Sequence, residues 1–194
     1  HEPSRRQRQM CIRDSLYNTI LITAAFYLFF ITLRDFFHRK YRNLSQITAH
    51  FSFSILILSI LFNNIFSSEV ITNLKINETY QAQNLKINFE SIEQENKQNF
   101  KAIKGKFIVE DQSGLIEVMQ PELRIYNQPN IVTSEADIKT NIFTDKFMTM
   151  NYVQNQDYFN IRYQVKPFMI WIWISTILLC LSGCLSLIRK KYEN

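Results

Sequence analysis

The sequence is poor in the residues that build disulfide-bonded domains, metal centres and many active sites. Glycine, histidine and cysteine each occur three times and proline four times among 194 residues. The segment 67–166 contains neither histidine nor cysteine, which excludes disulfides, thiol catalysis and imidazole ligands from it. Its carboxylates occupy scattered polar positions, so we predict that they are solvated surface groups and that none is catalytic.

Apolar residues are concentrated in three blocks, at Tyr17–Leu33, Ile47–Phe66 and Phe168–Ile188. About 20 helical residues cross a hydrocarbon core of about 30 Å. The blocks predict transmembrane helices at 16–34, 47–66 and 167–188. The expected fold is therefore a membrane α-helical bundle fragment of three transmembrane helices, with a β-rich extracytoplasmic domain inserted at 67–166.

Small residues recur along the second and third blocks at helical spacing. Because lipid provides little hydrophobic force between helices, small side chains mark the faces at which helices pack closely. This pattern predicts close packing and favours a bundle larger than three helices. The residues concerned are Ser45, Ala49, Ser52 and Ser59 in the second block, and Ser175, Ser182, Gly183 and Ser186 in the third.

The formal net charge of +5 is distributed unevenly along the chain. Basic residues gather in the loop 35–46 and in the tail 189–194, whereas 67–166 is slightly acidic. The positive-inside rule places the loop and the tail in the cytoplasm and 67–166 on the outer side. Membrane lipid explains these basic groups, so no nucleic-acid partner is expected.

The segment 67–166 shows several stretches in which apolar and polar residues alternate, as they do in half-buried strands. The clearest stretches are Phe159–Lys166, Leu85–Phe89 and Leu123–Tyr126, and Lys106–Glu110 and Leu115–Met119 flank a predicted hairpin turn. Ser134–Lys139 is predicted to be a short helix capped by Ser134. The scarcity of glycine and proline favours a compact antiparallel sandwich or open barrel.

Residues 1–15 are polar and basic. Within them, Met10–Ser15 resembles the translation of a transposon adaptor used in sequencing libraries, so we exclude this segment from fold reasoning. The expectation is that the natural chain continues upstream of Leu16. A short native basic arm is the alternative.

His50 is the candidate functional residue. It lies about one turn inside the second predicted span, where an ionisable group is costly unless it faces a partner within the bundle. Imidazole is a common axial ligand of haem iron, and a hydrogen bond to a neighbouring helix or to interfacial water is the structural alternative. His38 is expected to be a solvated group of the basic loop.

Two further pairs of residues have structural interpretations. Cys180 and Cys184 are one helical turn apart in the third span and are predicted to be packing residues, neither ligands nor a redox pair. Trp171 and Trp173 lie near the outer end of that span, where aromatic residues anchor helices at the membrane interface.

From Leu44 to Lys191 the chain resembles the carboxy-terminal part of the CcmF family (CcmF/NrfE), a haem lyase subunit of the cytochrome c maturation system. The resemblance rests on an ordered series of motifs, each weak alone. They are Ala49-His50, Ser67-Ser68-Glu69, Pro121–Tyr126 as Pro-x-x-Arg-x-Tyr, Thr133–Ile138, Ile161–Pro167 followed by Trp171-Ile172-Trp173, and Ser182-Gly183.

The resemblance implies a part in attaching haem to apocytochrome c on the outer face of the membrane, with other cytochrome c maturation subunits as partners. Proteins of this family also hold a haem b between two transmembrane histidines. His50 matches one of these axial ligands to the haem iron. The expected location is the bacterial cytoplasmic (inner) membrane with 67–166 in the periplasm, and the mitochondrial inner membrane is the alternative.

The sequence also departs from the family. Ser52 stands where the family usually has glycine, which predicts slightly wider helix packing beside the haem. The tryptophan-rich segment, the outer histidines and the partner histidine of the family belong upstream, so this fragment is not expected to be active alone. Two alternatives stay open: a cofactor-free membrane assembly or scaffold protein, and a sensor whose output lies on another protein.

Overall fold

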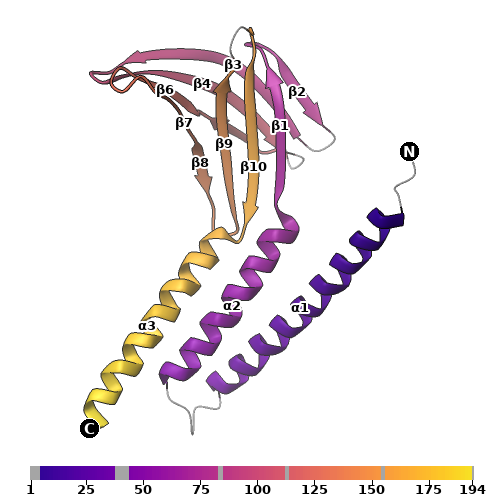
Figure 1. The fold of residues 1–194 in the computed structure, drawn as a ribbon, viewed down its shortest axis with the longest axis vertical. Coiled ribbons are helices and arrows are strands. Elements are labelled where there is room, and N and C mark those ends of the chain that lie inside the picture. The colour runs from indigo at the N-terminus through magenta and orange to yellow at the C-terminus, as the bar shows by residue number, and fades with distance from the viewer. Residues whose placement is uncertain (1–4, 38–43, 83–84, 112–113, 154–155, 194) are drawn as a thin grey trace. The chain divides into compact units, whose positions relative to one another are not determined.

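The computed structural model describes residues 5–37, 44–82, 85–111, 114–153 and 156–193, with side chains from residue 19 to residue 188 within these ranges (Figure 1). The chain divides into two compact units. We call His1–Phe66 with Pro167–Asn194 the helical unit, and Ser67–Lys166 the sandwich unit.

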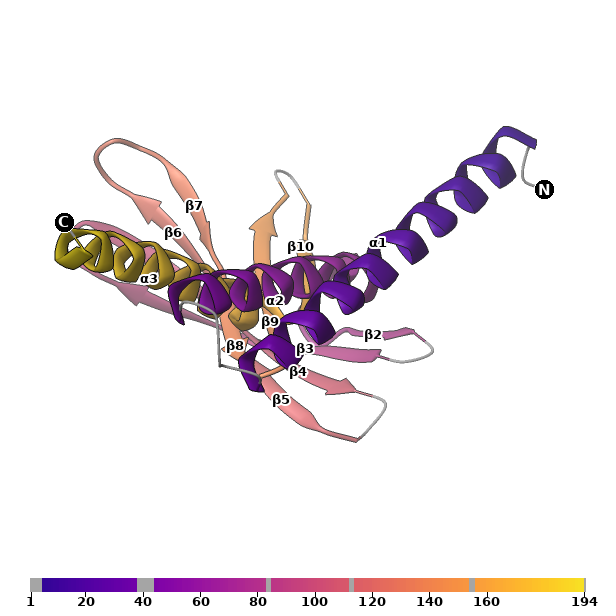
Figure 2. The same cartoon turned by 90° about the horizontal axis from the view of Figure 1, so that it is seen from below.

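The helical unit consists of α1 (Arg5–Phe37), α2 (Leu44–Phe66) and α3 (Met169–Glu193). Each contains a stretch long and apolar enough to cross a membrane, at Thr19–Phe37, Leu44–Phe66 and Met169–Ile188. The helices extend into both ends of the predicted basic loop 35–46, since α1 continues to Phe37 and α2 begins at Leu44. Figures 1 and 2 show α2 between α1 and α3, and α2 contacts both.

The two neighbours of α2 contact different faces of that helix. Aromatic rings join α1 to α2, with ring centroids 5.6 Å apart for Phe29 and Phe51 and 6.0 Å apart for Phe26 and Phe62. Such tilted ring pairs add to the dispersion attraction between the helices. Large aromatic side chains therefore take part in the α1–α2 contact.

Small residues form the α2–α3 contact instead. Ser52 and Ser59 of α2 and Ser182 of α3 are buried, and the Ser45 hydroxyl donates a hydrogen bond of 2.7 Å to the carbonyl oxygen of Ser182. The Asn63 amide donates another of 2.7 Å to the carbonyl of Pro167. The predicted close packing is confirmed at these serines.

Other small residues of the predicted pattern lie outside this contact. Gly183 and Ser186 are exposed on α3, and Ala49 is only half-buried on α2. The prediction of a packing face is therefore wrong for Gly183 and Ser186 within this three-helix unit.

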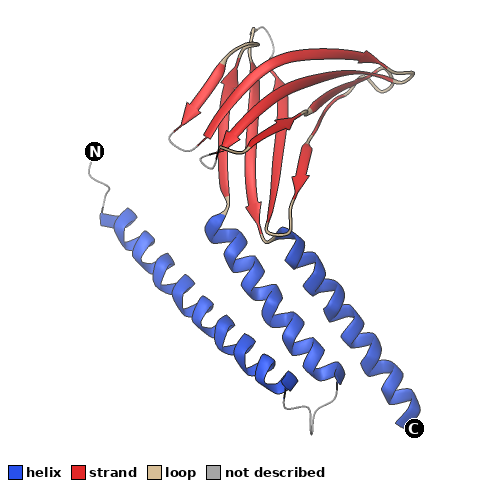
Figure 3. Ribbon diagram, turned by 180° about the vertical axis from the view of Figure 1, so that it is seen from behind, coloured by secondary structure: helices blue, strands red, loops and turns tan. Residues whose placement is uncertain are grey.

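The sandwich unit contains two antiparallel sheets (Figure 3). Sheet A has the strand order β1 (Ser68–Leu74), β10 (Phe159–Pro167), β9 (Thr144–Tyr152), β8 (Asp137–Thr140). Sheet B has the order β2 (Thr79–Ala82), β3 (Leu85–Asn96), β4 (Phe100–Asp111), β6 (Glu122–Tyr126), β7 (Val132–Glu135), and β5 (Ile116–Met119) also pairs with β4. The strands predicted from alternating residues are all confirmed.

The core between the sheets comes from the inward residues of that alternation. Phe89 and Phe107, paired on β3 and β4, stack with their ring centroids 4.3 Å apart. A side chain at Gly105 would place its Cβ 2.6 Å from the Phe107 ring, so this position needs a glycine. The buried core residues are Leu74, Ile87, Phe89, Phe107, Val109, Met119, Leu123, Met148, Met150, Ile161 and Tyr163.

The predicted helix at Ser134–Lys139 is wrong. This segment is extended, with β7 in sheet B and β8 in sheet A on either side of Ala136. The Ser134 hydroxyl donates to the carbonyl of Met150, and the Asp137 carboxylate accepts the backbone N–H of Gln120, both at 2.7–2.8 Å. Ser134, which was expected to cap a helix, therefore binds the neighbouring strand β9, because tertiary pairing outweighs a local capping pattern.

We expect Phe107→Ala to destabilise the sandwich unit by about 3–5 kcal/mol, because it removes a fully buried ring and leaves a cavity beside Phe89. Ile108→Ala is the matched control, since Ile108 is the next residue of β4 and lies on the opposite, half-buried face. Unfolding followed by the β-sheet circular dichroism signal measures both. Equal losses for the two variants would contradict this core.

Candidate functional site

His50 lies on α2, six residues after the helix begins at Leu44, and its side chain is exposed. It is the only ionisable side chain of α2. Among the residues that the structure describes, no hydrogen bond or ion pair to His50 is found. The imidazole therefore has both ring nitrogens available within this part of the protein.

The position of His50 around α2 is defined by the two helix contacts. At 100° per residue, Phe51 and Phe62 lie on the side facing α1, and Ser52 and Ser59 lie on the side facing α3. His50 lies at the edge of the α1 side, because its neighbours one turn away, Ile47 and Ser54, are buried, whereas His50 itself is exposed. Further around the helix Gln46, Phe53 and Ile60 are exposed as well, and these exposed side chains form a third face of α2. This face, which we call the His50 face, is apolar apart from Gln46, His50 and, further along, Asn64.

Ser52 does not lie beside His50. It is fully buried, its hydroxyl donates to the carbonyl of Thr48 at 2.7 Å, and it is about 200° around the helix from His50. The wider packing beside a haem stays a prediction. The side chain that Ser52 adds relative to glycine lies at the α2–α3 contact.

The chemistry available at His50 is that of one imidazole on a largely apolar surface. Such a group fits an axial ligand of haem iron, because the iron needs a neutral nitrogen and the porphyrin needs apolar contacts. His50 is the only histidine among the described residues, and His38 lies outside them. Among the described residues, no group of three or more His, Cys, Asp or Glu side chains is placed to hold a metal ion.

The other residues singled out on the helices are not combined with His50. Cys180 and Cys184 are free thiols, and both are exposed on α3. They were predicted to be packing residues, but they do not take part in the α2–α3 contact. Trp173 is 62% exposed on the same helix. Its role as an interfacial anchor stays a prediction.

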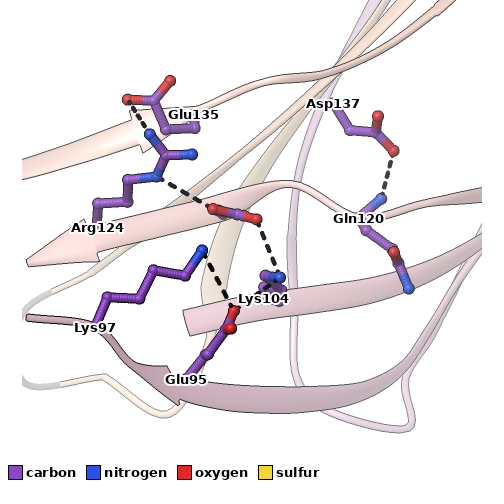
Figure 4. A network of polar contacts seen from close by, with 8 residues as sticks. Glu95, Lys97, Lys104, Gln120, Arg124, Glu135 and Asp137 are labelled. Carbon is purple, nitrogen blue, oxygen red and sulfur yellow. Dashed lines mark hydrogen bonds and ion pairs between the residues drawn. The ribbon is translucent and has the colours of Figure 1, made fainter. Parts of the chain in front are cut away.

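A chain of ion pairs crosses the face of sheet B that points away from the core (Figure 4). Lys104 on β4 contacts Glu95 on β3 at 3.0 Å and Glu122 on β6 at 3.5 Å. Arg124 on β6 continues the chain, contacting Glu122 at 3.2 Å and Glu135 on β7 at 3.8 Å. We call this set the sheet B charge network.

Within the sheet B charge network, the pKa values of Glu95, Lys104 and Arg124 are shifted so that the charged form of each is favoured. Hydrogen bonding to Lys104 lowers the pKa of Glu95, and the same bond raises the pKa of Lys104. Hydrogen bonds to Tyr126 and Glu122 raise the pKa of Arg124, whose guanidinium also lies 5.2 Å from the ring centre of Phe100. These groups stay ionised near neutral pH, so the network supplies no proton donor or acceptor for catalysis.

Other charged groups of the sandwich unit do not form an acid–base pair either. Asp145 is only 8% exposed, and its Oδ1 has no hydrogen-bond partner among the described residues. The Lys146 ammonium is paired with Glu117 at 2.8 Å. That this segment carries no catalytic residue stays a prediction. The cross-strand ion pairs could not be predicted, because they depend on strand register.

Taken by itself, the chain is an antiparallel β-sandwich inserted between two apolar helices, with one imidazole on an apolar helix face as its candidate ligand. Residues 65–167 match the family model described as the CcmF C-terminal beta-sandwich. The chain therefore belongs to the CcmF family, as its carboxy-terminal part.

Curated relatives are cytochrome c-type biogenesis proteins. The protein ccl1 of Rhodobacter capsulatus is 29% identical over 120 residues, which cover 62% of this chain and 18% of that protein. CcmF of Pseudomonas aeruginosa is 22% identical over 145 residues, which cover 75% of this chain and 22% of that protein. CcmF of Escherichia coli is 23% identical over 149 residues, which cover 77% of this chain and 23% of that protein. The chain spans about a fifth of the length of these relatives.

One solved structure, named Cytochrome c Heme Lyase CcmF, has the same fold. It matches with a TM-score of 0.57 and 17% sequence identity, over 73% of this chain and 24% of that chain. At this identity the likeness establishes the fold alone.

The pKa direction of Glu95 gives a prediction about pH. A lowered carboxylate pKa stabilises the folded state above about pH 4.5, and this stabilisation is lost as the pH falls through the folded-state pKa. We expect Glu95→Gln to lower the Tm slightly at pH 7 and to make the fall in Tm below pH 4.5 shallower.

Glu110→Gln is the control for this prediction. Glu110 contacts Lys86 across the same two strands, β3 and β4, at the longer distance of 3.4 Å. A Tm profile of Glu95→Gln that parallels the unchanged protein from pH 7 to pH 3 would contradict the stabilising role of the Glu95–Lys104 pair.

Proposed function

We propose that this chain is the carboxy-terminal part of a haem lyase subunit that acts in cytochrome c maturation. Its three apolar helices cross the bacterial inner membrane, and its sandwich unit lies on the periplasmic side. The membership of the CcmF family and the curated bacterial relatives support this proposal. Apocytochrome c and other maturation subunits are its proposed partners.

Within this proposal, His50 provides one axial ligand to a haem b. The proposal is supported by the place of His50 on α2, where it is exposed among largely apolar side chains although its neighbours Ile47 and Ser54 are buried. An ionisable group in a membrane helix is costly without a partner, and iron coordination would supply one. A bound haem b would contribute one-electron redox chemistry, and His50 would hold its iron.

The apolar residues of the His50 face also fit this role. Phe53 and Ile60 are 48% and 49% exposed, and they follow His50 along the same side of the helix. A porphyrin presents a flat apolar surface, so side chains of this kind pack against it with favourable dispersion energy. The second ligand would come from a segment of the complete protein outside the described residues.

We expect His50→Ala to reduce the haem content of the purified complete protein several-fold, because one of two axial bonds is lost. Absorption spectra and the haem-to-protein ratio measure this. Gln46→Ala is the matched control, since Gln46 lies one turn away on the same face and is not a ligand; it should retain its haem. An unchanged spectrum in His50→Ala would contradict the ligand role and favour a cofactor-free scaffold.

The placement of the sandwich unit is tested separately. Asp157 is exposed in the turn between β9 and β10, so Asp157→Cys in a cysteine-free background should react with a membrane-impermeant maleimide added to intact spheroplasts. A cysteine placed at Asn194 should react only after lysis. Labelling of Asp157→Cys only after lysis would contradict the periplasmic placement.

A further inference from the structure

The edge of β5 that points away from β4 is an open edge of sheet B. β4 pairs with β6 over Phe100–Lys104 and with β5 over Phe107–Glu110, and β7 pairs with β6. β7 ends at Glu135, and the chain then crosses to sheet A as β8. Within the described ranges, no strand therefore occupies the place beside β5 that a longer β7 would fill, and Figure 2 shows β5 at the margin of the sandwich unit.

The hydrogen bonds between β4 and β5 show which backbone groups this edge presents. The N–H of Asp111 donates to the carbonyl of Leu115 at 3.1 Å, so these two residues form a hydrogen-bonded pair. In an antiparallel ladder, such pairs alternate with pairs whose backbone groups point away from each other. The backbone groups of Glu117 therefore face β4, whereas the N–H and C=O groups of Ile116 and Val118 point to the open edge.

The same two residues carry exposed apolar side chains. Ile116 is 65% exposed and Val118 is 42% exposed, on the face of sheet B that points away from the core. Ile108, which lies opposite Val118 on β4, is half-buried on that face. An apolar strand edge with outward-pointing backbone groups is a template for pairing with an extended segment of another chain. The open edge of β5 has both properties.

A cavity of about 230 Å³ lies on the inner side of β5, between the two sheets. Glu117 of β5 lines it from sheet B, and Lys139 of β8 and Lys146 of β9 line it from sheet A. Directly opposite residues of paired strands point to the same face of a sheet. In a strand added beside β5, the side chain opposite Glu117 would therefore point toward this cavity.

The lining of the cavity favours an acidic side chain. Lys139 and Lys146 lie directly opposite each other on β8 and β9, and Glu117 is the only carboxylate among the described residues that line the cavity. Glu117 is paired with Lys146 at 2.8 Å. Lys139 lies 3.9 Å from Asp137, whose carboxylate also accepts the backbone N–H of Gln120 at 2.7 Å. A second carboxylate beside Lys139 would reduce the repulsion between the two lysines.

We propose that the open edge of β5 binds an extended segment of a partner polypeptide, which pairs as an additional strand of sheet B. Side chains of the segment opposite Ile116 and Val118 are apolar, and the side chain opposite Glu117 is acidic and reaches Lys139. The backbone groups of the edge select a polypeptide, and the cavity selects the sign of its charge. This surface lies within the sandwich unit and does not depend on the ligand role of His50.

Peptide binding to the complete protein in detergent tests the proposal. The probe is a short fluorescein-labelled peptide of alternating valine and glutamate, and fluorescence anisotropy measures its binding. We expect saturable binding, and weaker binding when lysine replaces glutamate. N-methylation of the valines should abolish binding, because their N–H groups pair with Ile116 and Val118. N-methylation of the glutamates should be tolerated, because their N–H groups point away from β5.

Variants of the protein identify the edge and the cavity. Val118→Pro removes an N–H that points to the open edge and retains the β4–β5 hydrogen bonds, so we expect binding to weaken about tenfold. Lys139→Glu should reverse the preference, so that the lysine peptide binds more tightly than the glutamate peptide, and it is the second variant should Val118→Pro fail to fold. Lys101→Glu is the matched control, since Lys101 is exposed near the other end of β4, and it should keep the original preference.

Three results would overturn the proposal. One is equal binding of the two N-methylated peptides, which would show that strand pairing is not involved. Another is an unchanged preference in Lys139→Glu, which would exclude the cavity. The third is an absence of binding to the complete protein; binding to the 194-residue chain alone would then show that another part of the same protein covers β5.

Discussion

The pairing of β1 with β10 is the constraint on which the rest of the architecture depends. It joins the first and last strands of the sandwich unit over the register Ser68–Val165 to Leu74–Phe159, and Arg162 on β10 pairs with Glu69 on β1. Hydrogen bonding to Arg162 lowers the pKa of Glu69, so this pair stays charged near neutral pH. Because these strands are adjacent, a domain of a hundred residues returns the chain to its point of departure, and α2 and α3 can pack directly on each other.

The close packing of α2 on α3 has a consequence for function. Serines occupy the side of α2 toward α3, aromatic rings occupy the side toward α1, and His50 is exposed at the edge of the α1 side. A histidine that both neighbours leave exposed is placed to meet something outside this three-helix unit. The proposed haem accounts for this placement, and it also accounts for the apolar residues that surround the imidazole.

Much of this arrangement could be predicted from the sequence. The strands follow from strict alternation, as in Phe159–Lys166, and the helices follow from their apolar length. The extended segment at β7 and β8 could not be predicted, because Ser134 and Asp137 have the local pattern of a helix cap and their true partners, Met150 and Gln120, are distant in sequence. For the same reason the partners of Lys104 required the register of three strands. His50 could be identified from the sequence as a candidate residue. That Ser52 faces away from His50 could not be predicted, because it depends on which helix covers which face of α2.

The coordination of haem iron by His50 is the central claim, and imidazole rescue tests it most directly. Replacement of His50 by glycine in the complete protein removes the side chain and leaves space for free imidazole. We expect His50→Gly to lose the low-spin haem b spectrum and added imidazole to restore it, because the free ring replaces the missing ligand. A spectrum that His50→Gly leaves unchanged, or that imidazole does not restore while haem is still bound, would contradict the account.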